Sequence, residues 1–344
     1  MSNLVFKALE VLNHLTPKYD LEFLKENHKK NLHLHAVGKS ANRMASELKD
    51  LGLKFKSEVI IGPHDGHPIP NTKSINSAKK LMKAASKLGE NDLVLFCLSG
   101  GTSSLMELPI EGIGLEELQR IYGDLLLSGK KIHEINEERK KLSQVKGGKL
   151  GELYLPAKVH CFVESDVQGN NIEVIGSSPV ISKELDHSFE IVLERSHLAK
   201  VSKKIFKDFH LEEVNEDIEG NIKKHLKLLA SHENLLTYGE STLRVSKKGI
   251  GGRNMHWVAL MGLELMKKNI KFEILSLGSD GIDGPTDSAG AWLDGRIPKD
   301  ELEEAISNFD TYKLFKKYEL LIQIGPTGYN LNDLRVIQLK KPNT

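Results

Sequence analysis

The sequence predicts an α/β protein with two domains, and three observations support this fold class. The chain has 344 residues, and domains typically contain roughly 100–200 residues. Hydrophobic residues make up 39% and charged residues 28%, which is enough apolar material for globular cores. Short apolar runs alternate with segments of helical periodicity, a pattern typical of mostly parallel, Rossmann-like sheets with helical crossovers.

Five apolar runs are short and rich in Val, Ile, Leu and Phe, so we expect buried parallel strands. Each run ends in a loop that carries Gly, Ser, Asp or Lys. Ligands of open α/β sheets bind beyond the carboxyl ends of the strands, and together the five loops favour a polar ligand cleft. For any single loop, an ordinary polar connection is the alternative. The runs are 32–37, 93–98, 159–163, 272–277 and 320–324.

Apolar residues at helical spacing predict helices between these strands. A charged helical stretch over 212–229 then precedes a new strand over 236–245, which places a domain boundary between them. The predicted domains are 1–232 and 233–332, and the return of 333–344 to the first domain, as a helix, is left open. The predicted helices are 41–51, 74–88, 115–127 and 135–145, and 170–186 is expected to be loop.

Composition excludes several classes of function. The chain has 48 Lys and Arg against 47 Asp and Glu, a net charge of +1, which argues against a nucleic-acid partner. No apolar run reaches the ~20 residues of a membrane span, and no secretory signal is recognised. The two cysteines, Cys97 and Cys161, are far apart, which excludes a disulfide framework and favours the cytoplasm.

The loop after the second predicted strand is the best candidate for binding an anion. Its glycines let backbone N–H groups approach a ligand, its hydroxyls add donors, and a helix start comes next. A serine-rich turn that merely caps this helix is the alternative. The loop consists of Ser99, Gly100, Gly101, Thr102, Ser103 and Ser104.

Two basic residues beside glycines are candidates for neutralising phosphate charge. Lys39 follows Gly38 at a strand end, but His33 replaces the first glycine that a P-loop requires, so this is not a P-loop. Arg253, followed by Asn254, opens a predicted helix after a glycine-rich segment and could bind a carboxylate or phosphate through its two-pronged guanidinium. A solvated lysine and a flexible turn are the respective alternatives.

Carboxylates and histidines supply further candidates. Asp280 and Asp283 lie in a loop broken by Gly and Pro, and could bind Mg²⁺ together with phosphate oxygens. A capping turn is the alternative. His67 and its neighbour His64 are better explained by a turn or substrate contact than by a metal site. Arg139 lies on a charged helix face that is typically solvated, with substrate binding as the alternative.

Together these segments resemble the class II glycerate kinases, whose C-terminal part is the MOFRL domain. The matches keep their order and run from residue 36 to about residue 334. The matching strings include 38–39, 66–70, 99–105, 135–136, 139–140, 142–143, 146–148, 251–254, 279–287 and 325–328.

The resemblance implies transfer of the γ-phosphoryl group of ATP to the 2-hydroxyl of D-glycerate, giving 2-phosphoglycerate. It also implies a divalent cation, usually Mg²⁺, a cleft between two α/β domains, and essential roles for Lys39 and Arg253. Asp280 or Asp283 would bind the metal or orient the hydroxyl, Asn254 and Asn332 would supply polar contacts, and Asp166 is a further candidate metal ligand.

Several alternatives remain open at this stage. Some relatives of this family are called hydroxypyruvate reductases, but no G-x-G-x-x-G fingerprint with a downstream acid supports a nicotinamide site. A non-catalytic sensor of sugar acids or nucleotides is suggested by departures from the family pattern after Asn254 and Asp166. The sequence does not decide which loop binds ATP and which binds glycerate. A homodimer is the default expectation.

Overall fold

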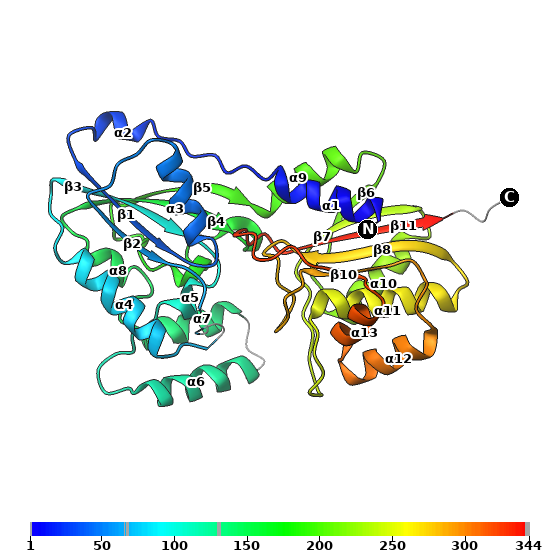
Figure 1. Ribbon diagram of the computed structural model, residues 1–344. Helices are drawn as coiled ribbons and strands as arrows, with labels where there is room; N and C mark the ends of the chain where they lie inside the picture. Colours follow the sequence, from blue (N-terminus) through cyan, green and yellow to red (C-terminus); the bar gives the residue numbers. More distant parts are fainter. Residues whose placement is uncertain (1, 65, 67–68, 129–131, 341–344) are drawn as a thin grey trace. The chain divides into compact units, whose positions relative to one another are not determined.

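The computed structural model describes residues 2–64, 66, 69–128 and 132–340, and the chain divides into two compact α/β units (Figure 1). Unit 1 comprises Met1–Thr16 and Arg195–Thr344, and unit 2 comprises Pro17–Glu194. The predicted α/β class is confirmed. Among the described residues, no helix has the length and apolar character needed to cross a membrane.

Unit 2 is built on a five-stranded sheet in which every neighbouring pair is parallel. The inner strands are buried on both faces, as their continuous apolar sequence predicts. The order is β2-β1-β3-β4-β5, and the strands are β1 (Asn31–Val37), β2 (Ser57–Ile61), β3 (Asp92–Leu98), β4 (Lys158–Ser165) and β5 (Ser188–Glu194).

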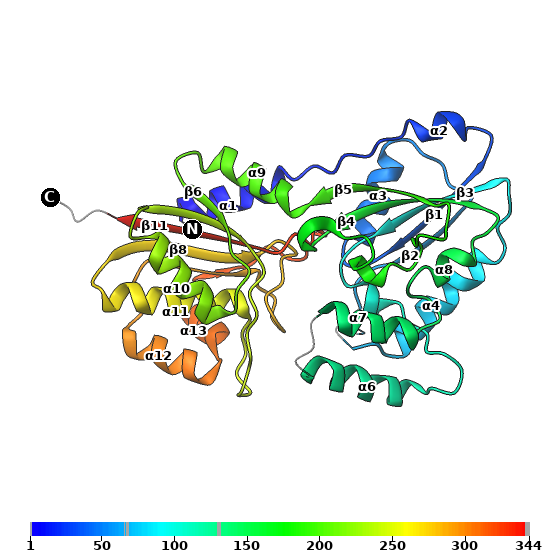
Figure 2. The same ribbon diagram turned by 180° about the vertical axis from the view of Figure 1, so that it is seen from behind.

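Helices cover both faces of this sheet, with α3 on one face and α4 on the other (Figures 1 and 2). The helices predicted at 41–51, 74–88 and 115–127 are confirmed, and 170–186 is loop with short 3₁₀ turns. The elements are α2 (Phe23–Glu26), α3 (Ala41–Asp50), α4 (Thr72–Ala85), α5 (Thr102–Leu105), α6 (Leu115–Leu127), α7 (Ile132–Lys141), α8 (Lys149–Glu152), η1 (Gln168–Asn170) and η2 (Ile175–Ser177).

Unit 1 contains a six-stranded mixed sheet, so the expectation of a mostly parallel sheet is wrong for this unit. The C-terminal strand β11 lies between β7 and β8 and is antiparallel to both, and β8, β9 and β10 also pair antiparallel. Among the described strands of this sheet, only β6 and β7 are parallel neighbours. The order is β10-β9-β8-β11-β7-β6, with β6 (His210–Glu213), β7 (Asn234–Gly239), β8 (Lys271–Gly278), β9 (Gly290–Leu293), β10 (Leu321–Ile322) and β11 (Asp333–Lys340).

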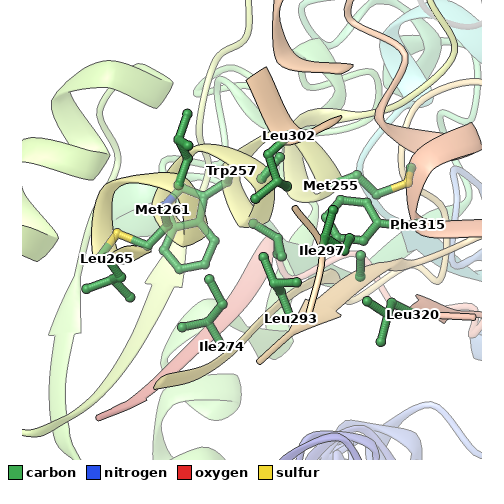
Figure 3. Packing of buried hydrophobic residues seen from close by; sticks show 14 of the residues in the cluster. Met255, Trp257, Met261, Leu265, Ile274, Leu293, Ile297, Leu302, Phe315 and Leu320 are labelled. Carbon is green, nitrogen blue, oxygen red and sulfur yellow. The ribbon is translucent and has the colours of Figure 1, made fainter. Parts of the chain in front are cut away.

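The core of unit 1 forms where α11 packs on the sheet. Trp257, Met261 and Leu265 of α11 point toward Ile274 of β8 and Leu293 of β9, and all five are fully buried (Figure 3). Helices α10 to α13 lie on this face, and α1 and α9 lie on the other (Figures 1 and 2). The helices are α1 (Asn3–Asn13), α9 (Arg195–Ile205), α10 (Ile218–Leu228), α11 (Arg253–Lys267), α12 (Lys299–Asn308) and α13 (Thr311–Lys317).

The division into compact units differs from the predicted domain boundary. Residues 232 and 233 both fall inside unit 1, because β6 and β7, on either side of them, are neighbours in one sheet. The chain instead passes between units after residues 16 and 194. The segment 333–340 is a strand of unit 1, not a helix returning to the first domain.

Candidate active site

In unit 2, the loops at the carboxyl ends of β1 and β3 form one hydrogen-bonded structure. The two strands are neighbours, so their carboxyl ends lie side by side. The Lys39 N–H donates to the Gly100 carbonyl at 2.9 Å, and the Ser40 N–H donates to Ser99 Oγ at 3.0 Å. Gly38 has φ of +125°, and a Cβ there would lie 2.2 Å from Ser99 Oγ, so only glycine fits this crossing.

The hydroxyl groups of residues 99–104 form hydrogen bonds with protein groups, either inside the loop or in neighbouring segments, whereas we expected them to face a ligand. Thr102 donates to the Ser99 carbonyl at 2.7 Å, Ser104 donates to the Gly101 carbonyl at 3.2 Å, and Ser103 pairs with Ser177 at 3.0 Å. Within the described hydrogen bonds, none involves the N–H groups of Gly101, Thr102 or Ser103, at the start of α5. Backbone N–H groups are therefore what this loop offers to an anion.

Behind this loop lies a buried ionic network that the sequence analysis did not recognise. The Lys146 ammonium donates to the Ser103 carbonyl at 2.6 Å and forms an ion pair with Glu107. Glu107 also accepts hydrogen bonds from the hydroxyls of Ser143, at 2.5 Å, and Tyr122. Lys146 and Glu107 are 1% and 0% exposed, and burial lowers the pKa of Lys146.

Arg139 belongs to the same region, and its interpretation as part of a solvated face is wrong. It is 8% exposed, and its guanidinium lies over the Tyr122 ring, 4.6 Å from the centroid. Helix α7 ends at Lys141, so Ser143 and Lys146 lie in the turn after it and bridge back toward residues 107–109. Arg139 and Lys146 therefore face inward, whereas the neighbouring Glu137 and Lys141 are exposed.

His64 supports the interpretation of a turn. Its Nδ1 accepts the Gly66 N–H at 3.0 Å, so its Nε2 carries the proton and donates to the Leu105 carbonyl at 3.0 Å. Both ring nitrogens thus bind backbone of unit 2 rather than a metal. His67, predicted to bind substrate, lies outside the described residues.

In unit 1, the predicted residues Arg253, Asn254, Asp280, Asp283 and Asn332 gather where β7 and β8 end and β11 begins. The Ser279 N–H donates to the Asn332 carbonyl at 2.9 Å. The Thr327 N–H, in the loop after β10, donates to the Asp280 carbonyl at 3.1 Å, so this predicted loop also joins the cluster. Asn332 has φ of +69° and is 7% exposed.

Asp283 caps helix α11. The sequence analysis gave a capping turn as the alternative to metal binding, and the structure supports the cap. One carboxylate oxygen accepts the Asn254 N–H at 3.0 Å, and the other accepts the Met255 N–H at 2.8 Å. The N-cap residue itself, Gly252, has no side chain that could do this. Burial is the largest influence on Asp283 and raises its pKa to about 7.

Asp333, which the sequence analysis did not single out, holds Arg253 in place. Its carboxylate accepts two hydrogen bonds from Arg253, at 2.9 and 3.0 Å, one from Asn254 at 3.1 Å and one from Arg335 at 3.0 Å. Asp333 is fully buried, whereas the Arg253 side chain is 32% exposed and also pairs with Glu240. These carboxylates raise the pKa of Arg253 further, so it stays charged.

Of the carboxylates predicted to bind a divalent cation, some fit that role and one does not. Asp280 is half-buried, and its Oδ1 accepts the Ile282 N–H at 3.2 Å, so the carboxylate fits a role beside substrate phosphates. Asp283 does not fit, because its oxygens are directed at the α11 amides. Asp166 is half-buried after β4 of unit 2. In the described part of the chain, no three His, Cys, Asp or Glu residues cluster as a metal site.

Polar loops at the carboxyl ends of sheet strands are typical of α/β enzymes that bind small molecules. Family comparison identifies a domain of unknown function (DUF4147) over residues 3–210 and a MOFRL family domain over residues 233–333. The chain therefore belongs to the family that combines these two domains, in agreement with the resemblance of its motifs to glycerate kinases.

Several relatives that match most of the chain are named glycerate kinases or glycerate 2-kinases. The chain is 35% identical to a D-glycerate 2-kinase of Thermotoga maritima, covering 88% of this chain and 89% of the relative. A glycerate 2-kinase of Picrophilus torridus is 30% identical over 89% of this chain and 87% of its own length. A crystal structure of a Thermotoga maritima glycerate kinase (EC 2.7.1.31) matches with a TM-score of 0.79, 30% identity and 98% coverage of both chains.

Proposed function

We propose that this chain is a D-glycerate 2-kinase, which transfers the γ-phosphoryl group of ATP to the 2-hydroxyl of D-glycerate and releases 2-phosphoglycerate and ADP. The observation that carries the proposal is the 35% identity to a D-glycerate 2-kinase over nearly the whole chain. The enzyme is thus a phosphotransferase with an alcohol acceptor.

The site geometry suits phosphoryl transfer, which asks a protein mainly to position groups and neutralise charge. Lys39 lies at the carboxyl end of β1, beside a loop whose backbone N–H groups can bind an anion. Arg253 is held by Asp333 with part of its guanidinium exposed. We propose that turnover needs both residues, one from each unit.

Mg²⁺ belongs to the proposal as the partner of the ATP phosphates. Such sites commonly use one or two protein carboxylates and substrate oxygens. Asp280 is the carboxylate of unit 1 that fits, and Asp166 is the candidate in unit 2. When bound, the cation would offset negative charge on the transferred group.

The alternative functions have less support. Two Agrobacterium vitis relatives are named hydroxypyruvate reductases, but at 30% and 28% identity they match only 79% of this chain. This sequence lacks the dinucleotide-binding fingerprint that a nicotinamide-dependent reductase would use. The departures after Asn254 and Asp166 favour a non-catalytic sensor only weakly, because Lys39, Arg253 and Asp280 are all present.

We also propose a cytoplasmic homodimer. Both cysteines, Cys97 and Cys161, are free and buried, as suits a reducing compartment. Cyclic dimers are the commonest assemblies of such enzymes. Light scattering on the purified protein tests the dimer directly.

The experiment that tests the function is coupled ADP release with ATP, Mg²⁺ and a panel of small hydroxy acids. We expect turnover with D-glycerate that disappears with EDTA and returns with Mg²⁺ or Mn²⁺. ADP release that does not depend on any hydroxy acid would contradict the assignment.

A further inference from the structure

Arg139 is a buried cation, and its Nε donates to no acceptor in the described part of the chain. It is 8% exposed, and this Nε has no partner there. Its guanidinium lies against the face of Tyr122. A guanidinium carries five N–H donors, and leaving charged donors buried and unmatched is costly. Burial accordingly lowers the pKa of Arg139, although the group remains charged.

The charges around Arg139 do not balance. Lys146 and Glu107 are both buried and form an ion pair, so their charges cancel. Arg139 then adds a positive charge to the network, and so does the half-buried Lys149, whose ammonium donates to the Ser143 carbonyl at 2.6 Å. This region of unit 2 therefore carries a positive surplus, which matches a negatively charged ligand group.

The network also holds the Arg139 guanidinium in position. Tyr122 donates its hydroxyl to Glu107, which holds the ring in place beneath the guanidinium. Lys146 binds the same carboxylate and the Ser103 carbonyl. Glu107 and Lys146 thereby join Arg139 to the loop of Ser99 to Ser104.

We propose that Arg139 binds the carboxylate of the hydroxy-acid substrate, with Glu107, Lys146 and Tyr122 as positioning residues. The planar fork of a guanidinium matches the two oxygens of a carboxylate. The identity of the acid rests on the proposed function. The presence of a carboxylate subsite does not.

Calorimetric titration of the full chain tests the subsite without turnover. The probes are D-glycerate, glycolate and lactate, with glycerol as the uncharged analogue and ADP as the nucleotide. We expect at least one acid to bind and glycerol not to bind. Arg139→Gln should weaken binding of the acid about 10- to 100-fold, the value of charge-assisted hydrogen bonds, and leave ADP binding within twofold.

Two further variants separate binding from folding. Arg139→Lys keeps the charge without the fork, so its loss of acid affinity should be smaller than that of Arg139→Gln. Arg139→Met removes an unmatched buried charge and should raise the Tm of the ligand-free protein, while the acid no longer raises it. Arg120→Gln is the matched control, because Arg120 lies on α6 with its side chain 69% exposed.

Three results would overturn the proposal: unchanged acid binding by Arg139→Gln, a loss of ADP binding in place of acid binding, or no binding of any small acid to the unaltered protein. Acid binding that depends on Arg139, in a protein that releases no ADP, would instead refute the proposed function and leave the carboxylate subsite standing.

Discussion

At the scale of single residues, several predicted side chains of unit 1 do meet, but their roles differ from those expected. Arg253 and Asn254 are tied together by Asp333, a residue in a strand that the sequence analysis did not recognise. Asp283 satisfies the amides of α11 instead of facing a ligand. Type and spacing of residues identify the cluster, but partners 79 or 80 positions apart in the chain appear only in the fold.

We predict that Asp283→Asn lowers stability without altering the Mg²⁺ requirement, whereas Asp280→Asn raises that requirement. An amide group at 283 would place a donor against an α11 N–H and leave it unsatisfied, at a cost of about 1–3 kcal/mol. Thermal unfolding and the Mg²⁺ dependence of turnover measure the two effects. Equal shifts in Mg²⁺ dependence for both variants would contradict this prediction and indicate that Asp283 binds the metal.

The Asp283 carboxyl also gives stability a pH dependence. Its pKa in the folded chain is about 7, above the ordinary value of 3.8, so the folded state binds the extra proton between these values. Its contribution to the free energy of unfolding is complete below about pH 4 and is lost as pH rises through 7. Asp283→Asn should remove this part of the pH profile, which chemical denaturation at several pH values measures.

At the scale of elements, apolar runs and helical periodicity were sufficient to predict most of the unit 2 strands and helices. They failed for β11, whose Arg335 and Asp333 are charged yet buried, because the ion pair that permits this burial cannot be seen in a local pattern. The same reason hid the Glu107–Lys146 pair, so Arg139 and Lys146 looked like residues of a solvated face. Parallel pairing was overpredicted because β11 enters its sheet between β7 and β8.

Helix α11 provides a test of element packing. A Cβ at residue 252 would lie 2.2 Å from Asp283 Oδ1, so Gly252→Ala should displace the cap and cost about 1–3 kcal/mol in stability. It should also lower turnover, because Arg253 is the next residue. Gly123→Ala is the control: it lies in α6 with open space around it, and should be stabilising by up to ~1 kcal/mol. Unchanged unfolding of Gly252→Ala would refute the cap.

At the scale of the whole molecule, the compact units do not follow the order of the sequence. Unit 2 is inserted between residue 16 and residue 195 of unit 1, and α1 packs on α9 and β8 within unit 1. A boundary placed by composition cannot reveal such an insertion, because composition does not show which distant segments pack together. The candidate residues Lys39 and Arg253 consequently belong to different units.

We predict that Lys39→Ala and Arg253→Ala each lower kcat by ~10³ or more, since a cation at a phosphoryl transition state has about this effect. Both variants should keep the unfolding transition of the other unit. Lys79→Ala, on the exposed surface of α4, is the control and should retain full activity. Near-normal kcat in either variant would show that the substituted residue does not act at the reacting phosphoryl group.

The central claim is that the chain phosphorylates the 2-hydroxyl of D-glycerate. Phosphorus NMR of the reaction of D-glycerate with ATP and Mg²⁺ tests it most directly, because it separates the products by the position of the phosphate. The account predicts 2-phosphoglycerate and one equivalent of ADP. Accumulation of 3-phosphoglycerate, or ADP with inorganic phosphate and unaltered D-glycerate, would contradict it.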